Sequence, residues 1–132
     1  MPLRILITGT SAAVSQVTKT IIDRSLHNCK SEIVDYKQLS LSAEKADYDF
    51  AVINDLMADI YYRLPSALND VPSVLITNND RILTDPKRFG LFGAIKNTSG
   101  GAAGLVAFEK ELIAIINNGT HNTLERKSAD KP

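Results

Sequence analysis

Short apolar runs of strand type alternate with helix-compatible segments along this chain of 132 residues, and no other feature constrains its fold as strongly. The runs that we expect to be strands are residues 3–8, 32–36, 50–53, 72–77 and 91–95. Their alternation with helical segments predicts a parallel sheet whose strands are joined by crossover helices. We therefore expect an α/β fold of the flavodoxin-like type, with a doubly wound five-stranded parallel sheet flanked by helices.

Helical periodicity fills the gaps between these runs. The expected helices are residues 11–24, 56–64, 81–89 and 100–116, with a short or poorly formed helix within residues 37–47. Ser11 has a side chain suited to an N-cap, and Asn117–Gly119 is a typical stop signal for the last helix. Residues 1–119 are thus expected to form one domain, and the polar residues 120–132 a disordered tail or a linker.

Bulk properties exclude several classes of protein. Fifteen basic and fifteen acidic residues balance each other, so neither nucleic acid nor an anionic membrane surface is an expected partner. Cys29 is the only cysteine, which rules out an internal disulfide and suits a reducing compartment. The first apolar run is too short for a signal peptide or a membrane span. A cytoplasmic location is therefore expected.

Ligands of doubly wound sheets bind outside the carboxyl ends of the strands. The residues expected there are Gly9, Thr10, Ser11, Asn54, Asp55, Thr77 and Lys96. On these residues the chain resembles the receiver domains of bacterial two-component systems, over roughly Leu3 to Gly119. Receivers carry acidic residues after the first strand, a phosphorylated aspartate after the third, a serine or threonine after the fourth and a lysine after the fifth. Thr77 and Lys96 match the last two positions.

The local pattern is closest to the receiver of the chemotaxis methylesterase. Residues 4–8, followed by Ser11 and Ala12, are similar to that family's first strand and first helix start. Residues 96–113 are similar to its closing pattern of Lys-Pro, Ser-Gly and a helix, although Asn97 stands where that pattern has proline. The resemblance implies a receiver-like fold.

The same alignment of patterns implies that the acidic residues of a receiver are missing. Gly9 and Thr10 stand at the acidic pair, and Asn54 stands at the phosphoryl acceptor. A hard cation such as Mg²⁺ prefers carboxylate ligands, and a neutral amide is a poor nucleophile. We therefore expect no catalytic residue, no metal site and no cofactor. What remains is a degenerate phospho-acceptor pocket formed by Gly9, Thr10, Asn54, Thr77 and Lys96.

Asp55 is a candidate substitute acceptor. Successive residues of an extended segment point to opposite sides, so a carboxylate one place after Asn54 should point away from the pocket. An N-cap role for Asp55 on the following helix is the favoured interpretation.

These observations predict a phosphorylation-independent pseudo-receiver, which is a protein-protein interaction module of two-component or chemotaxis signalling and not an enzyme. Its expected partner is a histidine kinase, a chemotaxis component or an output domain, with a homodimer as an open option. By resemblance, residues 81–89 and 105–116 would form the interface.

The alternative is a small α/β nucleotide-binding or anion-binding enzyme that uses the Gly9–Ser11 loop and Lys96. This loop has one of the three glycines of a dinucleotide-binding fingerprint. We therefore interpret this spacing as a plain turn between a strand and a helix.

Overall fold

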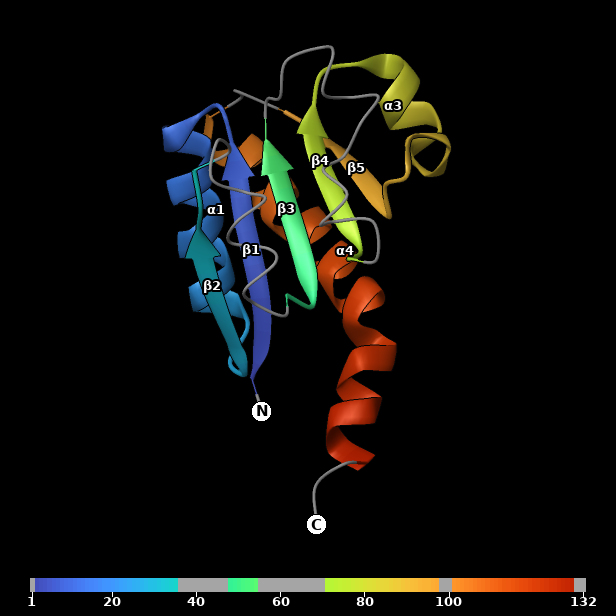
Figure 1. Ribbon diagram of the computed structural model, residues 1–132. Helices are drawn as coiled ribbons and strands as arrows, with labels where there is room; N and C mark the ends of the chain where they lie inside the picture. Colours follow the sequence, from blue (N-terminus) through green and yellow to red (C-terminus); the bar gives the residue numbers. More distant parts are fainter. Residues whose placement is uncertain (1, 36–47, 55–70, 98–100, 130–132) are drawn as a thin grey trace.

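The computed structural model describes residues 2–35, 48–54, 71–97 and 101–129 (Figure 1). The helices expected at residues 37–47 and 56–64 lie outside these ranges, and so does Asp55. Among the described residues, no helix combines the length and the apolar character needed to cross a membrane.

Five parallel strands form one sheet in the order β2-β1-β3-β4-β5. The strands are β1 (Leu3–Gly9), β2 (Cys29–Ile33), β3 (Phe50–Asn54), β4 (Ser73–Thr77) and β5 (Gly93–Lys96). Every residue of β3 and β4 is buried, as expected for central strands of a sheet with both faces covered. The predicted α/β fold of the flavodoxin-like type is therefore confirmed.

Two apolar clusters lie on opposite faces of the sheet, because successive strand side chains point to opposite sides. On one face, Ile5 and Ile7 pack with residues of α1 (Ala12–Ser25) and α4 (Gly101–Ala129). On the other face, Leu6 belongs to a cluster with Ile82 of α3 (Asp80–Thr84). Figure 1 shows α1 and α4 behind the sheet and α3 beside the upper end of β4.

The edge strand β2 begins and ends about three residues earlier than the sequence predicts. It runs from Cys29 to Ile33, with Leu3 of β1 in register with Cys29, whereas the sequence predicts a strand over residues 32–36. Only Ser31 of this strand is buried. Since an exposed edge strand carries little apolar signal, the pattern of the sequence does not locate it.

The segment after β4 is divided into two short helices. Asn79 caps α3 through a hydrogen bond from the Arg81 N–H to its Oδ1 atom. Pro86 then begins the 3₁₀ helix η4 (Pro86–Phe89), which ends at Gly90 with a positive φ of 76°. Proline has no N–H to donate and suits the first position of a helix, so one expected helix becomes two.

The last helix is longer than the sequence predicts. Helix α4 continues through Asn117–Gly119 and ends at Ala129, so the predicted end of the helix is wrong and residues 120–129 are helical. A Cβ atom on Gly119 would lie 2.3 Å from the Phe50 ring, and Thr120 is fully buried. Gly119 therefore serves close packing, which offsets its low helix propensity of about 1 kcal/mol relative to alanine. The assignment of residues 120–132 as a linker stays a prediction.

Candidate functional site

Asn54 lies at the carboxyl end of β3, and its side chain is completely buried. Its Nδ2 atom donates to the Ser15 Oγ atom at 2.8 Å and to the Thr8 carbonyl at 3.2 Å. Its Oδ1 atom accepts from the Ser11 N–H at 3.1 Å. One amide group thus connects the end of β3 to the end of β1, to the following turn and to the first turn of α1. We call these four residues, Thr8, Ser11, Ser15 and Asn54, the Asn54 joint.

Gly9 is placed against the Asn54 joint by the pairing of the strands. It is in register with Asn54, and a Cβ atom on Gly9 would lie 2.1 Å from the Asn54 carbonyl oxygen and 2.4 Å from Oδ1. Its φ of 149° is also rare for residues that carry a side chain. Glycine is needed at this position because both the space and the backbone conformation exclude other residues.

The N–H groups of the turn after β1 are occupied. Thr10 donates its N–H to the Asn54 carbonyl at 3.2 Å, and Ser11 donates to the Asn54 side chain. The Ser11 Oγ atom in turn accepts from the Val14 N–H at 3.2 Å, which confirms Ser11 as the N-cap of α1. The Thr10 and Ser11 N–H groups, two of the donors that a phosphate could use at a loop of this kind, are therefore bonded within the protein.

Thr77 and Lys96 form a separate pair on the neighbouring strands. They are in register across β4 and β5. Thr77 is buried and its Oγ1 atom accepts from the Asn79 N–H at 3.1 Å, so this hydroxyl shapes the turn before α3. Lys96 is exposed, and no hydrogen bond or ion pair joins its ammonium group to the described part of the chain.

The structure therefore brings Gly9, Thr10 and Asn54 into direct contact and leaves Thr77 and Lys96 beside them on the next two strands. Among the described residues, no three His, Cys, Asp or Glu side chains gather closely enough to hold a metal ion. In the described part of the chain, this edge of the sheet offers a network of neutral hydrogen-bonding groups, with the ammonium group of Lys96 at its side.

Ser15 is the member of the joint that the sequence does not reveal. It is buried on the inner face of α1, beside Thr18. Residues four apart in a helix lie on the same face, so the pair Ser11 and Ser15 marks a polar line pointing at the end of the sheet. The available sequence signal is a serine four residues after the N-cap, on the helix face that also carries Thr18 and Ile22.

Comparisons with known proteins support the fold and define a class. No protein-family model matches the chain, and no curated protein matches it. A crystal structure of adenylate cyclase from Rhodopirellula baltica is similar over 100% of both chains, with 12% sequence identity and a TM-score of 0.59. Likeness at this identity concerns the fold alone. The chain is thus an α/β protein with a single five-stranded parallel sheet of the flavodoxin-like type.

Proposed function

We propose that this chain is a phosphorylation-independent pseudo-receiver that acts by binding another signalling protein. The observation that carries the proposal is the burial and hydrogen bonding of the Asn54 side chain. At the position where a receiver has its phosphoryl acceptor, this chain has an amide that is buried and bonded to three groups of its own fold.

The chemistry of phosphorylation requires the opposite arrangement. An acceptor must present a nucleophilic oxygen to the phosphoryl donor, and a cation must neutralise the phosphoryl oxygens. Modification of Asn54 would break its bonds to Ser11 and Ser15, and the residues in contact with it are neutral. A chain that keeps the receiver-like fold without a phosphorylation site is expected to act through surface residues that bind a partner.

The occupied N–H groups of Thr10 and Ser11 also favour this proposal over the alternative of a nucleotide-binding enzyme. A phosphate at the Gly9–Ser11 loop would have to compete with Asn54 for the same donors. The name adenylate cyclase belongs to the similar structure from Rhodopirellula baltica, and a likeness at 12% sequence identity concerns the fold alone.

The test is treatment with acetyl phosphate, and separately with beryllofluoride, in the presence of Mg²⁺. Intact mass spectrometry should find no phosphoryl adduct, and the melting temperature should not change. A receiver with its acidic residues in place provides the positive control. A stable adduct would contradict the proposal, and the Asp55→Asn variant would then show whether Asp55 had accepted the group.

Binding of another signalling protein requires a separate measurement. Affinity for purified histidine kinases and chemotaxis proteins of the source cell should be measurable by titration calorimetry. It should be the same before and after acetyl phosphate treatment. Binding that appears only after treatment would mean that the switch is intact.

A further inference from the structure

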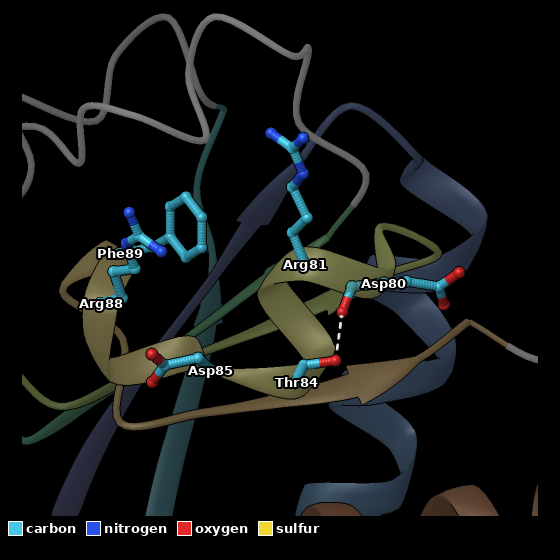
Figure 2. Close-up of a pocket in the computed structure, with 6 residues that line it drawn as sticks. All are labelled: Asp80, Arg81, Thr84, Asp85, Arg88 and Phe89. Carbon is cyan, nitrogen blue, oxygen red and sulfur yellow. Dashed lines mark hydrogen bonds between the residues drawn. The ribbon is translucent and has the colours of Figure 1, made fainter.

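The described residues of α3 and η4 line an open hollow of about 1020 Å³. The lining residues are Asp80, Arg81, Thr84, Asp85, Arg88 and Phe89 (Figure 2). Pockets for small ligands occupy roughly 300–1,000 Å³, so this hollow is at the large end of that range. Its described lining residues come from the segment that follows β4, and none of the residues of the Asn54 joint lines it.

Among the described residues that line the hollow, two arginines carry the cationic groups. Arg81 and Arg88 are both exposed, and no described carboxylate forms an ion pair with either guanidinium group. By contrast, Arg4 and Arg24 pair with Glu32 and Glu109. In the view of Figure 2, the Arg81 and Arg88 side chains extend to the same side of the α3–η4 turn. Guanidinium groups present a planar fork of donors that matches the oxygens of a phosphate.

Phe89 lies on the same side as the two arginines in Figure 2. It is half-buried and packs against the apolar cluster that contains Ile82 and Leu91. A ring held in this way offers a fixed surface for stacking of a planar ligand group. The Thr84 hydroxyl donates to the Asp80 carbonyl at 2.7 Å, so it is committed to the helix and is not a free donor.

The carboxylates decide which kind of anion fits. Asp80 and Asp85 also line the hollow, and their side chains point in opposite directions in Figure 2. They disfavour a simple anion, but they can accept hydrogen bonds from hydroxyl or amino groups of a ligand. A suitable ligand therefore combines a phosphate, a planar ring and several neutral donors.

We propose that the hollow formed by α3 and η4 binds a nucleoside monophosphate. Its phosphate lies between Arg81 and Arg88, its base stacks on Phe89, and its ribose hydroxyl or base amino groups donate to Asp85 or Asp80. The site is distinct from the Gly9–Ser11 loop. It does not depend on the absence of phosphorylation, so either proposal can fail without the other.

Titration calorimetry with adenosine monophosphate as the probe tests the site. The nucleotide should bind more tightly than adenosine, ribose 5-phosphate or inorganic phosphate, since each of these lacks one of the matched groups. Arg81→Gln and Arg88→Gln should each raise the Kd by about tenfold or more, the loss expected for one charge-assisted contact. The matched control is Lys87→Gln, because Lys87 is an exposed cation of η4 that does not line the hollow.

Each variant is first checked for an unchanged circular dichroism spectrum and melting temperature. The proposal is overturned if adenosine monophosphate does not bind at millimolar concentration. It is also overturned if Lys87→Gln weakens binding as much as the two arginine variants do. Binding that is lost with Lys96→Gln and kept with Arg81→Gln would place the nucleotide at the strand ends and refute the site on α3 and η4.

Discussion

Asn54 has the shape of aspartate but the opposite hydrogen-bonding capacity at one of its two terminal atoms. Its Nδ2 atom donates to Thr8 and Ser15, whereas a carboxylate oxygen at the same place could only accept. The Thr8 carbonyl would then face a negative charge, in a position without contact with solvent. The joint is therefore specific for an amide.

We expect Asn54→Asp to lower the free energy of unfolding at pH 7 by about 3 kcal/mol or more, because it buries a charge and leaves an acceptor unpaired. Urea denaturation of the purified variant measures this change. The control is Asn78→Asp, which makes the same substitution at an exposed position just after β4. It should change the stability by less than about 0.5 kcal/mol.

The deficit of Asn54→Asp should depend on pH. Burial beside a carbonyl raises the pKa of a carboxyl group above its ordinary value of about 3.9. The folded variant then holds a proton that the unfolded chain has already lost, so its stability falls as the pH rises from about 4 towards 7. A deficit that is constant between these pH values would contradict the burial of a charge as its cause.

Cys29 is a second residue whose chemistry follows from its surroundings. Burial, with further contributions from the Asp23 and Asp49 carboxylates, raises the pKa of the thiol to about 11. Because the thiolate is the reactive form, alkylation of the folded protein by iodoacetamide should be slow at pH 8 and accelerate towards pH 11. In urea the rate should rise near pH 8.5, the ordinary value for cysteine. Mass spectrometry of quenched samples measures both rates.

The linked effect on stability has a definite sign. A thiol whose pKa is raised on folding contributes stability that is complete below its unfolded pKa and is lost as the pH rises through about 11. Equal alkylation profiles for the folded and the unfolded chain would show that Cys29 is not desolvated.

At the residue scale, sequence reasoning located most of the strand-end residues but not their bonds. The register of β1 and β3 brings Gly9 to Asn54, and that register comes from pairing across the sheet, which no local pattern contains. The resemblance to receivers predicts that Asn54 replaces the aspartate that accepts the phosphoryl group. The role of Asn54 as a hydrogen-bonded joint required the location of Ser15.

The elements were predicted well where they are buried and less well where they are exposed. β1, β3 and β4 agree with their apolar runs within one residue, since continuous burial leaves a strong signal. The edge strand β2 and the end of α4 did not follow their local patterns. In α4, packing of Gly119 on Phe50 overrides the stop signal, because a propensity cost of about 1 kcal/mol is small beside such contacts.

Gly119→Ala tests the packing of α4 on the sheet. We expect it to lower the stability, whereas a glycine-to-alanine substitution inside a helix usually raises it. Alanine in place of glycine inside a helix normally stabilises by about 1 kcal/mol. Here the added methyl group would collide with Phe50, whose ring also meets Phe92 edge to face at a centroid distance of 6.2 Å. Overpacking of this kind typically costs about 1–3 kcal/mol, and we expect thermal denaturation to show a net loss. Asn118→Ala, at the exposed neighbour, should be neutral or slightly stabilising.

In the described part of the chain, the long helix α4 runs past one end of the sheet. Figure 1 shows the C-terminal part of α4 extending beyond the end of the sheet at which the strands begin. The last buried residue of this helix among those whose side chains are described is Thr120, whose Oγ1 atom donates to the Ile116 carbonyl at 2.7 Å.

Truncation should therefore have a sharp boundary. A chain that ends after residue 122 keeps the contacts of Gly119 and Thr120, whereas one that ends after residue 117 loses them. The second truncation should lower the melting temperature by about 10 °C or more, since 1 kcal/mol corresponds to roughly 4 °C for a domain of this size. A gradual decline over residues 122–129 would mean that the helix end contributes to the fold.

The Asn54 joint also bears on how long the folded state persists. Its bonds to Ser15 and Thr8 span 39 and 46 residues of chain, and such distant contacts form only after the loops between them have closed. Bonds that are absent from the folding transition state act almost entirely on the rate of unfolding. The bonds of Asn54 would then form after the sheet has assembled. Their loss should raise the unfolding rate, and so shorten the lifetime of the native protein, while the folding rate stays nearly unchanged.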